Sequence, residues 1–256
     1  MADPYPRVSI VTICRNAVGS VERTLRSVAG QDYPLIEHIV VDGASSDGTQ
    51  AVIERFRDRI SRYASEPDLG ISNAFNKGVA ASTGRWILVL NAGDTLIGND
   101  ALRRLVSRCG DAARIVTARS RCGGKSIPRY RIRGKLGLIL RAHLSHQATL
   151  VHRDVYAEYG GYDEAFRVRM DFDFFLRVLP REKLTFVDDW LVDFQPGGIS
   201  GREFLLHWNE GRRALAKNGC GALARIQYEA LFFLLSCERL ARTFGAFLHR
   251  RIFTGP

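Results

Sequence analysis

The first third of the chain alternates short apolar runs with segments of helical apolar spacing. Residues 8–13, 36–41 and 86–90 are rich in β-branched and other apolar residues, as expected for strands buried on both faces of a parallel sheet. Between these runs, the spacing of apolar residues predicts helices over 19–30, 49–59 and 72–81, with a short strand over 60–65. Alternating strands and helices predict an open α/β sheet with right-handed crossovers.

Polar side chains follow the predicted strands where each of them ends. Arg15 and Asn16 come after the first strand, residues 42–47 after the second, and residues 91–94 after the strand over 86–90. Ligands of open α/β sheets bind beyond the carboxyl ends of the strands. The sequence therefore predicts a ligand site at this edge of the sheet.

Composition narrows the class of protein. Apolar residues make up 46% of the 256 residues and charged residues 25%, which are values of a folded globular chain. No uninterrupted apolar run reaches membrane-spanning length, and residues 1–7 are too polar for a signal peptide. The five cysteines form no CxxC pair, so neither a zinc site nor a disulfide framework is expected. We therefore expect a cytoplasmic protein.

The net charge of +10 favours an anionic partner. Nucleotide phosphates, nucleic acid and an anionic membrane surface all fit, and plain solubility is an alternative that needs no partner. Charge alone does not choose among them. The arginine residues are dispersed and no nucleic-acid reader motif is present, which disfavours a nucleic-acid-binding protein.

The second half of the chain has mixed patterning. Residues 112–145 are basic, and the alternation at 129–133 predicts an exposed strand or hairpin. Further strands are expected near 150–151 and over 184–192, with helices over 153–159 and 172–179. From residue 201 the pattern is helical to the end, with a break at 218–221. We expect a domain over residues 1–200 and a helical extension over residues 201–256.

The turn after the second predicted strand carries the sequence DGASSDGT from Asp42 to Thr49. A carboxylate at the end of a buried strand faces the ligand crevice, where it can accept from a base N–H or a ribose hydroxyl. The alternative is a tight loop in which Ser46 or Asp47 caps the helix that begins at Thr49.

Two further acidic segments could carry chemistry. Asp94 ends the run after the strand over 86–90 and could hold Mg²⁺ or Mn²⁺, which bind oxygen ligands and bridge phosphates. The alternative is a simple turn.

Asp171 and Asp173 could supply a general base, or could complement a helix dipole. A helix cannot direct both into one pocket, so one of them is expected to be structural. His146 and Gln147 are either site ligands or a buried polar pair.

Taken in order, these segments resemble the family 2 glycosyltransferases of the GT-A fold. Those are inverting enzymes that use nucleotide-diphosphate sugars. The resemblance covers residues 7 to 200 and rests on segments 8–12, 41–49, 65–78, 90–94, 145–147 and 160–173. The subgroup that it favours builds bacterial exopolysaccharide, lipopolysaccharide or glycolipid glycans. It implies a Rossmann-like, mostly parallel sheet flanked by helices, with a C-terminal helical extension.

The resemblance also implies roles for individual residues. Asp171 matches the base position, with Asp173 as the fallback, and Asp94 matches the metal position. His146 and Gln147 would contact acceptor or phosphate. The donor nucleotide and sugar would be bound by Thr12, Arg15, Asn16, Asp42, Ser45, Asp68, Asn76, Lys77, Asn91, Ala92 and Gly93. The chain departs from the family pattern at Asn91 and Gly93, which are often Asp, and at Met170, which is often Glu.

The expected activity is transfer of a sugar, from a UDP-sugar in the first place, to a glycan or lipid-linked acceptor. A divalent metal ion is the expected cofactor. A nucleotidyltransferase or another nucleotide-sugar enzyme is the alternative, although no GxGxxG or GxxxxGK[ST] loop follows the first strand. Residues 197–200 fit either a loop that closes over the diphosphate or a connection to the tail.

The C-terminal segment is amphipathic and basic. Phenylalanine and leucine residues between 232 and 253 are interleaved with Arg239, Arg242, Arg250 and Arg251. Such a helix could lie on an anionic membrane surface, or its apolar stripe could pack on the body or on a partner subunit. The first alternative would make the protein peripheral at the inner face of the cell membrane.

Overall fold

The computed structural model describes residues 5–110, 113–122, 125–127 and 144–253, and only the backbone of 125–127, 200 and 238–253. Its strands are β1 (Val8–Cys14), β2 (Ile36–Asp42), β3 (Arg62–Ser65), β4 (Trp86–Asn91), β5 (Thr95–Leu96), β6 (Ile115–Cys122), β7 (Lys125–Ile127), β8 (Thr149–His152) and β9 (Leu184–Phe194). They form one sheet in the order β3-β2-β1-β4-β8-β6-β9-β5, with β7 paired to β6.

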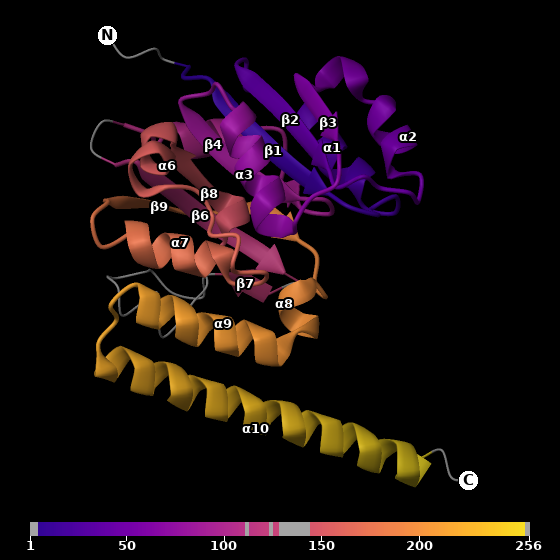
Figure 1. Ribbon diagram of the computed structural model, residues 1–256. Coiled ribbons are helices and arrows are strands. Elements are labelled where there is room, and N and C mark those ends of the chain that lie inside the picture. Colours follow the sequence, from indigo (N-terminus) through magenta and orange to yellow (C-terminus); the bar gives the residue numbers. More distant parts are fainter. Residues whose placement is uncertain (1–4, 111–112, 123–124, 128–143, 254–256) are drawn as a thin grey trace.

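Helices cover the two faces of this sheet (Figure 1). They are α1 (Val21–Ala29), α2 (Thr49–Glu54), α3 (Ile71–Ala81), α4 (Ala101–Val106), α6 (Arg153–Tyr159), α7 (Met170–Val178), α8 (Ile199–Arg202), α9 (Phe204–Lys217) and α10 (Ala222–Phe253), with the 3₁₀ turns η1 (Arg57–Arg59) and η2 (His146–Ala148). The alternation of strands and helices predicted for the first third of the chain is confirmed. The segment 129–133 lies outside the described residues.

Strands β1 to β4 are parallel, and their register places the polar residues together. Cys14 pairs with Asp42, and Ile13 pairs with Asn91. The carboxyl ends of β1, β2 and β4 therefore meet at one edge of the sheet. This is the edge at which the sequence predicted a ligand site.

The other half of the sheet is mixed. Strand β8 is antiparallel to both β4 and β6, whereas β9 runs parallel to β6. Sequence patterning missed β6 because its polar residues obscure the strand. Arg119 and Arg121 place their guanidinium carbons 5.6 and 5.1 Å from the centre of the Trp190 ring on β9. The two guanidinium groups thus lie against the Trp190 ring, while β6 stays paired with β9.

Alternate residues of β1 and β4 face core clusters on opposite sides of the sheet. Val11 and Val89 face a cluster that includes residues of α3, α6, α7 and α9, whereas Ile10 and Leu88 face a cluster that includes α4. Helix α3 lies so close to β1 that a Cβ atom at Gly78 would overlap the Val11 side chain. The period of two along each strand therefore fixes which face each helix covers.

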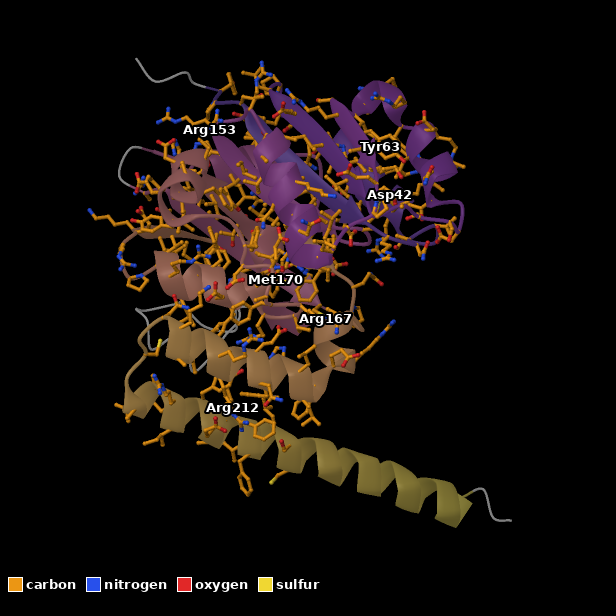
Figure 2. The ribbon with its side chains drawn as sticks, in the orientation of Figure 1. Asp42, Tyr63, Arg153, Arg167, Met170 and Arg212 are labelled. Atoms are coloured by element: carbon orange, nitrogen blue, oxygen red, sulfur yellow. The ribbon has the colours of Figure 1, made fainter. Side chains whose placement is uncertain are left out.

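The C-terminal helices stack outward from α7, with α10 outermost and extending past the body (Figure 1). Trp208 of α9 is buried and its ring lies 4.4 Å from that of Tyr228 on α10. Gly211 permits this approach, because a Cβ atom there would overlap the Tyr228 hydroxyl. Figure 2 shows Met170, at the start of α7, between the sheet and α9, and Arg212 between α9 and α10.

Candidate active site

A cavity of about 1070 Å³ opens at the carboxyl edge of the parallel strands. The loop after β1, the end of β4, η2 and the start of α7 all contribute to its wall. Nine of the residues predicted from sequence line it: Arg15, Asn16, Asp68, Asn91, Ala92, Asp94, His146, Gln147 and Asp171. Its volume suits a ligand of the size of a nucleotide.

The turn after β2 holds the loop after β1 in place. Ser45 Oγ accepts from the Asn16 backbone N–H at 2.8 Å, and Thr49 Oγ1 accepts from the Ala17 N–H at 2.7 Å. In return, Asn16 Oδ1 accepts from the Ser46 N–H at 3.0 Å. Asn16 has a left-handed backbone with φ of 48°. These cross-loop bonds offset the strain of that conformation, so the cavity wall is preformed.

Asp42 lies beneath this wall and does not line the cavity. Its carboxylate is fully buried and accepts from the Ser45 N–H at 3.0 Å, from the Ser45 hydroxyl, and from Ser65 Oγ at 2.6 Å. The expectation that this carboxylate faces the ligand crevice is therefore not met here. The tight loop proposed as the alternative is present: Asp47 accepts from the Thr49 N–H at 3.0 Å, although the N-cap residue of α2 is Gly48 and has no side-chain cap.

Thr12 and Gly93 are also occupied within the fold and do not line the cavity. Thr12 is fully buried, and its hydroxyl lies 3.0 Å from Nε2 of the buried His38. Gly93 has φ of 108° in the turn after β4, and its N–H donates to Thr24 Oγ1 at 2.8 Å. Both residues stabilise the strand ends that carry the cavity wall.

Asn76 and Lys77 on α3 make structural contacts instead of facing the cavity. The Asn76 amide donates to the Tyr162 carbonyl and accepts from the Tyr162 N–H, each at 2.8 Å. Lys77 Nζ lies 2.7 Å from a Glu66 carboxylate oxygen. Gly161 leaves room for the Asn76 amide, since a Cβ atom there would overlap it. Helix α3 is thereby tied to the segment before α7.

Arg15, in the same loop as Asn16, and Asp68 also line the cavity. The Asp68 side chain packs on Gly43, where a Cβ atom would overlap its carboxylate. Arg15 Nη1 is 3.8 Å from Asp68 Oδ1, and the Arg15 side chain is 64% exposed. Its guanidinium is therefore available to an anionic group in the cavity.

The chemically most suggestive part of the site is a chain of four side chains. Asp94 Oδ2 accepts from both the backbone N–H and the Nδ2 of Asn91, each at 3.0 Å. Asn91 Nδ2 is 3.4 Å from Nε2 of His146, and His146 Nδ1 is 3.2 Å from Asp171 Oδ2. The chain runs from the end of β4 through η2 to the first turn of α7.

The two carboxyl groups at the ends of this chain have opposite pKa shifts. Burial raises the pKa of Asp94 above its ordinary value, and hydrogen bonds from Asn91 only partly oppose this. Burial would also raise the pKa of Asp171, but the hydrogen bond from His146, together with the charge of Arg169, lowers it below its ordinary value. Asp171 is therefore ionised at neutral pH and able to accept a proton.

Asp173 points away from the cavity. It is fully buried, and its carboxylate accepts from Lys217 Nζ and from Asn218 Nδ2, each at 3.0 Å, with Arg177 at 3.4 Å. The helix thus separates the two aspartates as the period of 3.6 requires. Asp173 joins α7 to the end of α9, and the fallback assignment of the base to Asp173 has no geometric support.

Sequence reasoning missed the buried Glu210 on α9. Its carboxylate accepts from three consecutive backbone N–H groups, those of Arg167, Val168 and Arg169, at 2.8, 2.8 and 2.9 Å. These residues lead directly into Asp171. A glutamate within the apolar stripe of α9 was the only sequence signal, since a buried carboxylate needs donors.

The segment after β9 also lines the cavity. Its lining residues are Phe194, Gln195, Pro196, Gly197, Gly198, Ile199, Gly201, Arg202 and Glu203. The sequence predicted that 197–200 would be either a loop near the diphosphate or a connection to the tail. The segment lines the cavity and also leads into the tail, and closure over a ligand stays a prediction.

A divalent metal fits this site only if Asp94 is its one carboxylate ligand from the protein. Within the described residues, no group of three or more His, Cys, Asp or Glu side chains could hold a metal. A cation beside Asp94 would relieve the cost of burying that carboxylate. Mg²⁺ and Mn²⁺ commonly use one or two protein carboxylates and complete their shell with phosphates and water. The donor set therefore fits such an ion together with a diphosphate.

Comparison with known proteins identifies the class of enzyme. The family described as "Glycosyl transferase family 2" matches residues 9–204. An uncharacterized glycosyltransferase of Mycobacterium tuberculosis is 32% identical over 183 residues, which are 67% of this chain and 68% of the relative. The chain therefore belongs to the family 2 glycosyltransferases, and it is a transferase.

Two further relatives have more specific names. A PGL/p-HBAD biosynthesis glycosyltransferase of M. tuberculosis is 29% identical over 189 residues, covering 70% of this chain and 72% of the relative. The succinoglycan biosynthesis protein ExoO of Rhizobium meliloti is 36% identical over 112 residues, but this covers only 43% of this chain and 32% of ExoO.

Solved structures show the same fold at low sequence identity. Staphylococcus aureus TarS, in complex with UDP, has a TM-score of 0.65 at 17% identity over 83% of this chain and 65% of its own. The mannosyltransferase PcManGT of Pyrobaculum calidifontis, with GDP-Man and Mn²⁺, has a TM-score of 0.65 at 16% identity, covering 95% and 80%. The predicted GT-A fold, with its mostly parallel sheet flanked by helices and its C-terminal helices, is confirmed.

Proposed function

We propose that this glycosyltransferase moves a sugar from a nucleoside-diphosphate sugar, a UDP-sugar in the first place, to a glycan or lipid-linked acceptor, with inversion at the anomeric carbon. The observation that carries the proposal is that Asp94 and Asp171 line one cavity at the carboxyl edge of the parallel strands. One carboxylate is placed for the donor diphosphate, and the other for the acceptor.

Asp171 acts as the general base in this proposal. A quarter of its side chain (26%) is exposed to the cavity, and it is ionised at neutral pH. It takes the proton of an acceptor hydroxyl while that oxygen forms the new bond to the anomeric carbon. The bond from the anomeric carbon to the diphosphate oxygen breaks, and the nucleoside diphosphate leaves with its electron pair. A single displacement of this kind inverts the configuration.

The donor side is assigned to the loop after β1 and the end of β4. Arg15 and Asn16 would contact the nucleotide, and the exposed Arg15 guanidinium suits a phosphate. Asp94 would hold Mg²⁺ or Mn²⁺, which when bound neutralises charge that develops on the diphosphate leaving group. The solved complex of PcManGT with GDP-Man and Mn²⁺, which has the same fold, supports a donor nucleotide and a divalent metal in this site.

The acceptor proposal rests on the relatives and on α10. Their names place them in succinoglycan and PGL/p-HBAD biosynthesis, so we propose a role in cell-envelope polysaccharide or glycolipid assembly, in the cytoplasm at the inner face of the membrane. The α10 helix exposes 64 to 67% of Leu223, Ile226, Phe233 and Leu234. This apolar face is followed in the sequence by Arg239, Arg242, Arg250 and Arg251, a combination that suits an anionic membrane surface. No described helix is long and apolar enough to cross a membrane.

Thermal shift measurements on the full chain test the donor site. UDP, GDP, dTDP and CDP would each be added with and without Mn²⁺, since a ligand that binds only the folded chain raises the midpoint. We expect a shift with one nucleotide, UDP in the first place, enlarged by Mn²⁺. Asp94→Asn should abolish the enlargement, whereas Asp100→Asn, at the start of α4, should not. No shift with any nucleotide in the parent chain would contradict the proposal.

Vesicle flotation tests the membrane surface. The full chain should float with phosphatidylglycerol vesicles but not with phosphatidylcholine vesicles. Phe233→Ser should reduce this binding, whereas Leu69→Ser, which alters a more exposed apolar residue (86% against 67%) outside α10, should not. Equal binding of both variants, or no binding by the parent chain, would remove α10 as a membrane surface and leave a partner protein as its occupant.

A further inference from the structure

Asn91 and His146 lie between the two carboxylates of the site, and neither donor binding nor proton abstraction accounts for their contacts. We propose that His146 is a positioning residue that holds Asp171 through its Nδ1–H, and that Asn91 fixes the proton on that nitrogen. The inference rests on the proposed role of Asp171 as the base. It assigns His146 a different part from the acceptor or phosphate contact expected from the sequence.

The proton position follows from the Asn91 amide. Its nitrogen lies 3.0 Å from Asp94 Oδ2, an acceptor that also takes the Asn91 backbone N–H. A carboxylate requires a donor, so the amide must present NH₂ and not its carbonyl. The same NH₂ lies 3.4 Å from His146 Nε2. Nε2 therefore accepts, and in the neutral ring the proton is on Nδ1.

The Nδ1–H then reaches the base. His146 Nδ1 is 3.2 Å from Asp171 Oδ2, and the Phe172 backbone N–H donates to Oδ1 at 2.8 Å. Each carboxylate oxygen thus has one internal donor and keeps a lone pair for an acceptor hydroxyl. Only 12% of the His146 side chain is exposed, and its ring packs edge-on against Phe75 with centroids 5.5 Å apart. This packing limits rotation of the ring.

Both ring nitrogens are therefore engaged inside the protein. A histidine that bound substrate phosphate would present an N–H to the cavity, whereas here Nε2 faces Asn91 and Nδ1 faces Asp171. This arrangement favours a histidine that acts through Asp171 over one that binds the ligand directly.

The inference also explains why position 91 is asparagine. An aspartate there would accept a hydrogen bond from Nε2–H of His146 and would place a second carboxylate beside Asp94. The neutral ring would then present a bare Nδ1 to Asp171, so that two acceptors would face one another. Asn91 prevents this because its amide can donate to both of its neighbours.

Two substitutions of His146 separate its two nitrogens. The amide nitrogen of Asn reaches the position of Nδ1, and that of Gln reaches the position of Nε2. His146→Gln should lower kcat about 10- to 100-fold with an unchanged KM for the donor, because Asp171 loses its orienting donor. His146→Asn should recover most of that loss, since it still donates to Asp171.

His152 provides a matched control. Its side chain is also 12% exposed, but it lies at the end of β8, where Nδ1 accepts from the Asp154 N–H. His152→Asn and His152→Gln should give equal kcat values. Melting temperatures of all four variants would show whether a loss of kcat reflects misfolding.

Nitrogen-15 NMR of the histidine rings in the full chain gives a readout independent of turnover. At mildly alkaline pH, His146 should show the Nδ1–H tautomer, and Asn91→Asp should convert it to Nε2–H or to the charged ring. A parent Nε2–H tautomer, or equal kcat values for His146→Asn and His146→Gln with turnover lost in Asp171→Asn, would overturn the inference alone. Absence of transfer by the parent chain would count against the proposed function, and the NMR result would still decide the proton position.

Discussion

Behind the cavity wall formed by the loop after β1, the polar side chains of the turn after β2 are bonded to backbone and to one another. Asp42, Ser45 and Thr49 all serve the loops, and none of them lines the cavity. On the wall formed by η2 and α7, His146 and Asp171 reach the cavity. The first wall gives the site its shape, and the second carries the groups that can take part in a reaction.

The contrast teaches that a polar residue at the carboxyl edge of a parallel sheet has two possible uses. Strands that end together bring many loop N–H groups into one place, and each buried one needs an acceptor. Asp42 and Ser45 meet that need. A side chain is left over for a ligand only where the local backbone is already satisfied, as it is in the first turn of α7, where Glu210 serves the preceding N–H groups.

The largest effect that we expect sets the two aspartates of α7 apart. Asp171→Asn should lower kcat about 1000-fold, within the usual contribution of a general base, because the amide cannot take the acceptor proton. The unfolding midpoint should stay near that of the parent, since Asn can still accept from His146. Steady-state kinetics with a competent acceptor measure the first quantity and thermal denaturation the second. Near-normal turnover would remove Asp171 as the base.

Asp173→Asn should show the reverse pattern. Its buried carboxylate has donors from Lys217, Asn218 and Arg177, so neutralising it should lower the free energy of unfolding by about 3 kcal/mol. The kcat of the folded fraction should change little, because Asp173 does not line the cavity. Urea unfolding at neutral pH gives the stability. A kcat loss as large as that of Asp171→Asn would show that the two faces of α7 are not separate.

His38, which lies on β2, should make the stability of the fold sensitive to acid. Burial lowers the pKa of His38 from 6.5 to about 4, so between these values the unfolded chain binds a proton that the folded chain does not. Stability due to His38 is therefore complete above pH 6.5 and falls by about 2 kcal/mol on going to pH 5. His38→Gln can retain the Thr12 contact and should reduce this pH-dependent loss in urea titrations. An equal loss in both proteins would contradict the assignment.

The smallest effect concerns the packing of Asp68 on Gly43. Gly43→Ala places a methyl group against the Asp68 carboxylate and the Arg15 side chain, whose flexible ends can shift. We expect a KM for the donor raised severalfold, about 1 kcal/mol or less, with kcat retained. Gly19→Ala is the control, because a Cβ atom there meets no atom within 4 Å. If the two variants have the same donor KM, the Gly43 contact does not shape the donor site.

The sequence predicted the order of strands and helices in the first third of the chain and the edge at which the cavity lies. It predicted from helical geometry that only one of Asp171 and Asp173 would reach a pocket. It could not predict the roles of Asp42 or Asn76, because their bonds to Ser65 and Tyr162 join segments far apart in the chain. Strand β6 was not predicted because Arg119 and Arg121 stack on Trp190, a contact made only after β9 has paired.

Glu210 holds the segment that leads into α7, and this limits where the chain can be divided. One carboxylate of α9 holds three consecutive N–H groups immediately before α7, and Lys217 of the same helix holds Asp173. A chain cut at residue 200 would retain Asp94, His146 and Asp171 in the cavity. It would lose Glu210, which holds the backbone just before Asp171. Chimaeras that exchange tails between such enzymes should therefore be joined after residue 218, so that α9 travels with the sheet and α10 becomes the interchangeable module.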